Sequence, residues 1–171
     1  VTNIEEESQF LLENFFDWFF EIGYSELIFA DRVILYEGDS ERLYIRKLIK
    51  LPEFSALADS YIAFIQVGGA YAHNYVPILK MLKIKTLIIT DLDYNKDAMS
   101  MEEVKREDSK STNATINYCY RLVHADREKD YSPTIKELYD FQVKGESVLY
   151  NGLVYLTFQD EKSTARTLEE A

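Results

Sequence analysis

The sequence has little of several features that whole classes of protein require. A single cysteine, Cys119, excludes an internal disulfide and is typical of the reducing cytoplasm. A secretory signal is excluded, because Glu5, Glu6 and Glu7 stand where a basic region and an apolar core are needed. No apolar run is long enough to cross a membrane. We therefore expect a cytoplasmic protein with no membrane partner.

Basic residues are also scarce. The 19 Lys and Arg against 30 Asp and Glu give a formal net charge of −11. This is the wrong sign for a protein that holds phosphates through its bulk charge. A nucleic-acid enzyme with this balance needs bound cations, a local basic strip or a basic partner domain.

The chain nevertheless has what a folded domain needs. Its 171 residues are 47% hydrophobic and 14% aromatic, which excludes a disordered segment and suffices for one core. Short apolar runs alternate with amphipathic segments, which predicts an α/β fold with a mainly parallel central sheet flanked by helices. Strands are predicted at residues 32–36, 61–67, 86–90 and 153–158. Helices are predicted at residues 41–49 (capped by Ser40), 72–83, 114–124 and 133–141.

The two ends of the chain carry separate expectations. Residues 5–22 place large apolar side chains near helical spacing, in a wide aromatic stripe. We expect residues 1–25 to form an added N-terminal helix that packs on this domain or docks on a neighbour, and residues 26–171 to form the main domain. The last residues resemble the first turn of another helix, so we expect the chain to be a fragment.

Acidic residues and glycines stand where the predicted strands end. They are Glu37, Gly38 and Glu41 after the first strand, Gly68 and Gly69 after the second, and Asp91 and Asp93 after the third. Sites in parallel sheets form at the carboxyl ends of strands, so we expect these residues to lie together. Asp91 and Asp93 are two residues apart in an extended segment, which aims both carboxylates at one face.

Converging carboxylates indicate a metal site. They repel one another strongly unless a cation neutralises them, and oxygen ligands without His or Cys favour Mg²⁺ or Mn²⁺ over Zn²⁺. We expect Glu37, Asp91 and Asp93 to share one such cation. For Glu41 a structural role remains open, because an acid in the first turn also stabilises the helix dipole.

Residues 29–43 resemble the first motif of the Toprim domain, in the form found in OLD-family (overcoming lysogenization defect) ATP-dependent nucleases. The pair Gly68-Gly69 and the run Thr90-Asp91-Leu92-Asp93 match the next two elements of that family in order and spacing. Residues 165–171 are similar to its later acidic motif. The resemblance spans about residues 26–171 and implies a Toprim-like fold.

The resemblance also implies a two-metal DNA endonuclease or nickase, in phage defence or DNA processing. Two Mg²⁺ or Mn²⁺ ions would activate water and stabilise the leaving oxygen. It implies a catalytic set of Glu37, Asp91, Asp93 and Glu169, and a metal-ligand set of Glu37, Glu41, Asp91, Asp93, Thr167 and Glu169. Family members also carry an ABC-type ATPase in the same full-length chain, through which they form homo-oligomers, and a catalytic Lys beyond the acidic motif. Neither a Walker A sequence nor that Lys is found here, so we expect the isolated chain to be weakly active or inactive.

Other residues have weaker readings. Lys162 and Arg166, near the acidic motif, are candidates for phosphate contact, as are Gly68 and Gly69. His73 and His124 are more typical of ordinary structural histidines, and Cys119 of the core.

Three alternatives stay open. Primases, topoisomerases and ribosomal-RNA maturases share the EG and DxD elements of the Toprim domain. A phosphoryl transferase of the haloacid-dehalogenase type uses DxD, but Asn95 stands where that chemistry needs Thr or Val, and Glu37 is left unexplained. The third alternative is a non-catalytic assembly or sensing module.

Overall fold

The computed structural model describes residues 26–57, 59–68, 71–94 and 109–159. Its centre is a five-stranded sheet with the strand order β2-β1-β3-β5-β4. The strands are β1 (Arg32–Tyr36), β2 (Ile62–Gln66), β3 (Lys85–Ile89), β4 (Val148–Leu149) and β5 (Val154–Thr157). β1, β2, β3 and β5 are parallel, and only β4 runs antiparallel, on β5. The predicted mainly parallel α/β sheet is confirmed.

The helices also fall close to their predicted positions. They are α2 (Glu26–Phe29), α3 (Asp39–Leu48), the 3₁₀ helices η1 (Pro52–Leu57) and η2 (Ala72–Tyr75), α4 (Val76–Leu82), α6 (Ala114–Val123) and α7 (Ile135–Val143). Pro77 lies in the first turn of α4, where its missing N–H costs nothing. Among the described residues, no helix is long and apolar enough to cross a bilayer.

The predicted cap of α3 is wrong. The helix begins at Asp39 with Gly38 as its N-cap, so Ser40 lies inside the first turn. The main-chain N–H of Gly38 donates to Glu41 Oε2 at 3.0 Å. The Glu41 carboxylate thus satisfies a donor that a Ser40 cap cannot reach.

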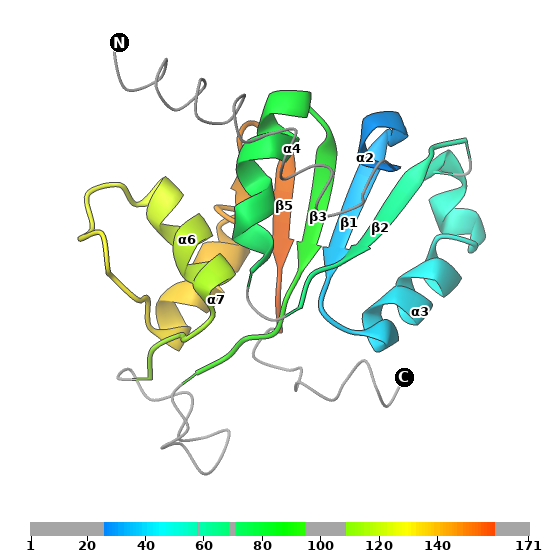
Figure 1. Cartoon of the computed structure of the whole chain (residues 1–171). Coiled ribbons are helices and arrows are strands. Elements are labelled where there is room, and N and C mark those ends of the chain that lie inside the picture. Colours follow the sequence, from blue (N-terminus) through cyan, green and yellow to red (C-terminus); the bar gives the residue numbers. More distant parts are fainter. Residues whose placement is uncertain (1–25, 58, 69–70, 95–108, 160–171) are drawn as a thin grey trace.

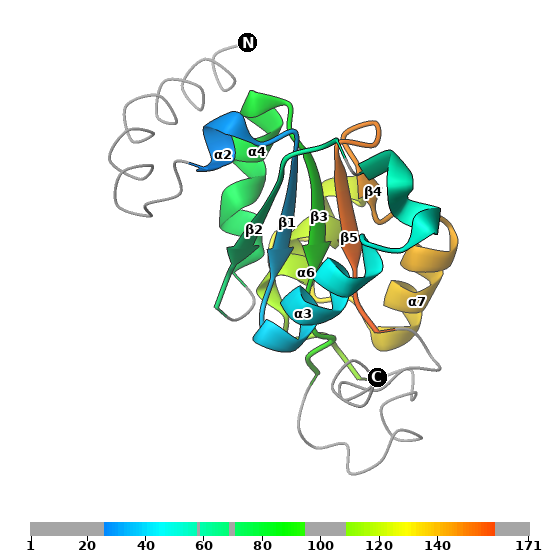
Figure 2. The same cartoon turned by 90° about the vertical axis from the view of Figure 1, so that its right-hand side faces the viewer.

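The helices lie on both faces of the sheet (Figures 1 and 2). α4, α6 and α7 cover one face and α3 lies on the other. The main core lies under α4, α6 and α7, where Leu35, Ile65, Ile88 and Ile116 are fully buried. Four parallel strands therefore end at one edge of a rigid sheet, where the candidate site lies.

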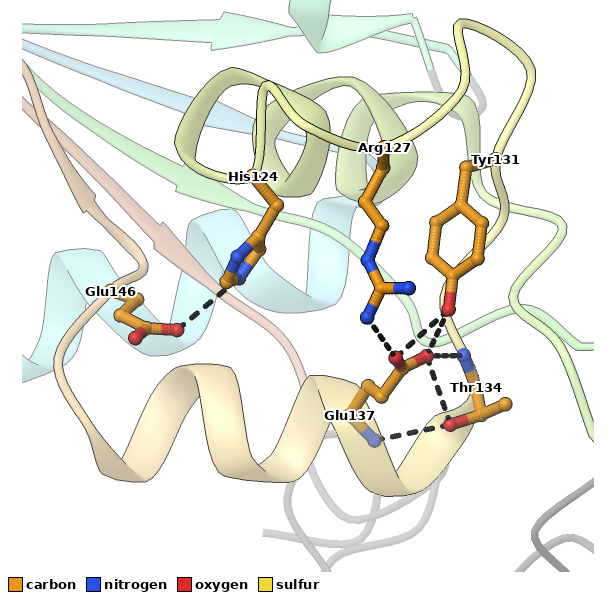
Figure 3. Close-up of polar contacts among 6 residues, drawn as sticks. All are labelled: His124, Arg127, Tyr131, Thr134, Glu137 and Glu146. Carbon is orange, nitrogen blue, oxygen red and sulfur yellow. Dashed lines mark hydrogen bonds and ion pairs between the residues drawn. The ribbon is translucent and has the colours of Figure 1, made fainter.

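A polar cluster joins the end of α6 to the start of α7 (Figure 3). The carboxylate of Glu137 accepts hydrogen bonds from the Thr134 main-chain N–H at 2.9 Å and from the Tyr131 hydroxyl at 2.7 Å. Arg127 adds an ion pair at 3.4 Å. Thr134 and Glu137 form a reciprocal capping box, which fixes where α7 begins. Just beyond the ends of the same two helices, His124 contacts the Glu146 carboxylate at 3.3 Å.

Candidate functional site

The carboxyl edge of the sheet brings together residues from three loops. Glu37 follows β1, Asp91 follows β3 and Gln159 follows β5. The main-chain N–H of Asp91 donates to Glu37 Oε1 at 3.3 Å. Residues 54 positions apart in the sequence therefore meet at this edge, as expected from the parallel strand order.

The Glu37 carboxylate is held by a buried relay of donors. The hydroxyl of Thr90 donates to Glu37 Oε1. The side-chain amide of Asn113, which is fully buried, donates to Thr90 Oγ1 at 2.8 Å. Because Asn113 occupies a lone pair of that oxygen as a donor, the Thr90 proton is left for Glu37.

Asp91 is held from the other side of the site. Gln159 Nε2 donates to Asp91 Oδ1 at 2.5 Å, and Gln159 Oε1 accepts from the main-chain N–H of Leu92 at 2.5 Å. Both ends of one amide therefore bind the acidic loop after β3. Gln159 leaves the end of β5, so this contact joins two neighbouring strand ends.

Asp93 lies at the more exposed end of the loop. Asn113 Nδ2 lies 3.4 Å from Asp93 Oδ2 and donates to the main-chain carbonyl of Asp91 at 2.8 Å. The main-chain N–H of Thr112 donates to the Asp93 carbonyl at 3.0 Å. The segment before α6 therefore sets the course of the acidic loop.

The three carboxylates influence one another electrostatically. Burial raises the pKa of Glu37 above its ordinary value of 4.5, and the charges of Asp91 and Asp93 raise it further, against the hydrogen bonds from Thr90 and Asp91. Burial also raises the pKa of Asp93 above 3.8, and the Asp91 charge adds to the effect. A cluster in which each anion disfavours the next is stabilised by a cation.

The donor chemistry suits a hard divalent cation, because every candidate ligand here is an oxygen. As the side chains stand, however, no three carboxylate, imidazole or thiol groups in the described ranges are arranged to hold a metal ion. Glu37 is turned to Thr90, and Asp91 to Gln159. Joint coordination therefore requires these side chains to exchange their protein donors for the cation. The shared cation stays a prediction.

Glu41 lies apart from this arrangement. Its carboxylate folds back onto the Gly38 N–H, and a Cβ at Gly38 would stand 2.9 Å from Glu41 Oε2. Glycine thus permits the close approach, and the structure gives Glu41 a capping contact. Its role as a metal ligand stays a prediction.

Several predicted site residues lie outside the described residues. They are Gly69, Lys162, Arg166, Thr167 and Glu169. Gly68 is exposed at the end of β2, with open space where a Cβ would stand. A role in phosphate contact stays a prediction for Gly68, Gly69, Lys162 and Arg166.

Sequence reasoning missed three residues that hold the site, namely Thr90, Asn113 and Gln159. It also missed a contact between α6 and η2, in which Thr115 Oγ1 accepts a hydrogen bond from the main-chain N–H of His73 at 3.1 Å. Asn113 is the N-cap of α6 and accepts from the Ile116 N–H at 3.0 Å. An Asn one residue before a helical pattern predicts a cap, but its contacts with a loop 20 residues earlier have no local signature.

The sequence model of the TOPRIM domain of overcoming lysogenization defect protein-like proteins matches residues 28–93. That range contains β1, β2 and β3 and ends at the acidic loop described above. Residues 28–93 are therefore similar to an OLD-like TOPRIM domain. The resemblance expected from the motifs around Glu37, Gly68 and Asp91 is confirmed.

Two curated relatives carry the name Endonuclease GajA. The one from Bacillus cereus strain HuB5-5 is 28% identical over 149 residues, which is 86% of this chain and 20% of that protein. The one from Bacillus cereus strain VD045 is 38% identical over 71 residues, or 40% of this chain and 12% of that protein. The chain thus spans a fifth or less of the curated relatives that it matches.

Among solved structures, the C-terminal region of the Burkholderia pseudomallei OLD protein is similar to this chain. It matches at a TM-score of 0.42 and 18% identity, over 77% of this chain and 56% of that one.

Proposed function

We propose that this OLD-like TOPRIM chain is the nuclease portion of a larger enzyme that hydrolyses DNA phosphodiesters as an endonuclease or nickase. The observation that carries the proposal is the meeting of Glu37 and Asp91 at the carboxyl edge, inside the range that matches the TOPRIM family. The endonuclease names of both curated relatives support it. The wider role that fits is phage defence or DNA processing in the cytoplasm.

Glu37, Asp91 and Asp93 would hold the first Mg²⁺ or Mn²⁺, and Glu41, Thr167 and Glu169 would contribute to a second. Such ions supply a Lewis acid and a water of lowered pKa. The residues of the chain position the phosphate and the ions. Thr90 and Asn113 orient Glu37, and Gln159 orients Asp91.

Bound cations also resolve the charge problem. A net charge of −11 repels DNA, and three clustered carboxylates deepen the repulsion at the site. Divalent ions reverse the local field that a phosphate meets. Lys162, Arg166 and the glycines Gly68 and Gly69 would add contacts with the DNA backbone.

An ABC-type ATPase domain in the same full-length polypeptide would control cleavage, and homo-oligomers would form through that domain. DNA would be the substrate.

The test is nicking of supercoiled plasmid over a Mg²⁺ and Mn²⁺ series. The chain is assayed alone and joined to an ABC-type ATPase domain, with Asp91→Asn beside the unaltered protein. Metal-dependent nicking that Asp91→Asn removes supports the proposal. A joined protein that binds DNA and hydrolyses ATP but never nicks favours the non-catalytic alternative.

A further inference from the structure

One row of apolar side chains crosses the whole sheet on the face that carries α3. The strand register places Phe64, Ile34, Leu87, Tyr155 and Val148 side by side, one from each strand. Cross-strand partners point to the same face, so these five side chains form one continuous band.

The band is covered at one end and open at the other. Ile34 is buried, and Phe64 lies under the Arg46 guanidinium, 5.0 Å from its ring centre. Tyr155 and Val148, at the other end, are 41% and 40% exposed.

The opposite face provides a direct comparison. Its neighbouring row, formed by Ala63, Val33, Thr86, Val154 and Leu149, is at most 4% exposed in every strand. That face is covered by α4, α6 and α7, whereas only α3 and η1 of the described elements lie on the other (Figure 2). The α3 face is therefore an incomplete layer over β3, β5 and β4.

A groove lies on this open part of the face. It has a volume of about 230 Å³ and is lined by Arg32, Ile34, Leu57, Lys85, Leu87 and Tyr155. Arg32 and Lys85 are the first residues of their strands, so both cations lie at the amino edge of the sheet. The groove thus has an apolar floor and a basic end.

Arg32 points to a missing partner. Its Nε atom is buried and has no hydrogen-bond partner among the described residues. Leaving a buried charged donor unpaired destabilises the fold. An occupant that brings acceptors to the amino edge would remove this penalty.

We infer that the groove binds residues 5–22 of this same chain as an amphipathic helix. This segment carries the apolar stripe of Phe15, Trp18, Phe19 and Ile22, with Asp17 and Glu21 between them. Residues 160–171 offer only Ala165, Leu168 and Ala171 as apolar side chains, too little to cover Leu87, Tyr155 and Val148.

The carboxyl end of this segment also suits the basic end of the groove in charge. Gly23 follows Ile22 and is the residue type that most often ends a helix. The helix end would then present free carbonyls, the negative end of its dipole and the Glu21 carboxylate, which suit Arg32 and Lys85. Residues 23–25 span up to about 10 Å and lead into α2. The next element after α2 is β1, which begins at the same amino edge of the sheet.

Trp18 is the sole tryptophan and reports the docking directly. When the segment is docked, we expect the fluorescence of Trp18 to lie at shorter wavelength than in a free peptide of residues 1–25. We also expect iodide to quench this fluorescence several-fold less than in the peptide. Tyr155→Glu removes both differences. Tyr71→Glu is the matched control, because Tyr71 is also exposed and lies outside the groove. Circular dichroism verifies that both variants fold.

A disulfide distinguishes the occupants. Glu21→Cys combined with Lys85→Cys is oxidised, while the native Cys119 is fully buried. Docking within one chain gives an oxidised monomer that migrates faster on a non-reducing gel. A disulfide-linked dimer assigns the groove to a second copy and overturns the inference. No disulfide, or a Trp18 that iodide quenches equally in wild type and Tyr155→Glu, also overturns it.

Discussion

The side-chain amide of Asn113 lies 2.8 Å from the Thr90 hydroxyl oxygen and donates a hydrogen bond to it. The same nitrogen donates to the main-chain carbonyl of Asp91 at 2.8 Å. One buried residue at the start of α6 thus fixes both the hydroxyl that holds Glu37 and the loop that carries Asp91. The acidic edge is therefore built by α6 as well as by the strands.

Asn113→Ala is expected to destabilise the protein by about 2–4 kcal/mol, because it removes a helix cap and leaves buried acceptors unpaired. Asn113→Asp keeps the cap acceptor and loses the amide donor, so it separates the two roles. Its new carboxylate oxygen would face the Thr90 oxygen and the Asp91 carbonyl at a buried position, so we expect Asn113→Asp to unfold in urea at least as easily as Asn113→Ala. We also expect it to weaken Mn²⁺ binding roughly 10- to 100-fold. Equal Mn²⁺ affinity in Asn113→Asp and wild type would reduce Asn113 to a cap.

Asp91→Asn is expected to abolish metal-dependent nicking while leaving the melting temperature without metal level or raised. The substitution removes a charge that raises the pKa of both Glu37 and Asp93, so it relieves repulsion. It also keeps an oxygen that can accept from Gln159. Scanning calorimetry in chelator measures the effect, and a large drop in melting temperature would show that the Gln159 contact outweighs the repulsion.

Glu137→Gln tests the cluster of Figure 3, at the start of α7. Burial alone raises the pKa of Glu137, but the hydrogen bonds from Thr134 and Tyr131 and the charge of Arg127 outweigh it and hold the pKa below 4.5. A lowered folded-state pKa stabilises the protein above pH 4.5, and this stabilisation is lost as the pH falls through the folded-state value.

At pH 7 we expect Glu137→Gln to lower the free energy of unfolding by about 1 kcal/mol, a modest figure because the pair is partly solvated. The difference from wild type should shrink as the pH falls below 4.5. Urea unfolding from pH 7 to pH 3 measures it, with the exposed Glu128→Gln as control. A difference that stays constant over this range would contradict the ionic origin of the stabilisation.

Much of the fold was predictable, because buried parallel strands appear as short apolar runs. β1 lies at the predicted residues 32–36, and the strand predicted at 86–90 is β3, Lys85–Ile89. β4 was missed because a strand of two residues, Val148–Leu149, shows no periodicity. The cap at Gly38 was missed because it depends on the Glu41 side chain, which folds back only once the turn has formed.

The site was predictable only in its acids. Glu37 and Asp91 follow strands, and parallel topology brings strand ends together. Asn113 and Gln159 reach the site from 22 and 68 residues beyond Asp91, through contacts that exist only in three dimensions. Such contacts leave no spacing to read in the sequence.

Titration of the chain with Mn²⁺, followed by calorimetry and by thermal unfolding, tests the central claim most directly. It compares wild type, Glu37→Gln and Asp91→Asn with Asp59→Asn, a control that removes an exposed acid before β2, at the opposite edge of the sheet. At one hundred times the dissociation constant, Mn²⁺ should stabilise wild type and Asp59→Asn by about 2.7 kcal/mol. The same concentration should leave Glu37→Gln and Asp91→Asn almost unchanged. Equal Mn²⁺ binding by all four proteins would contradict a metal site at the carboxyl edge.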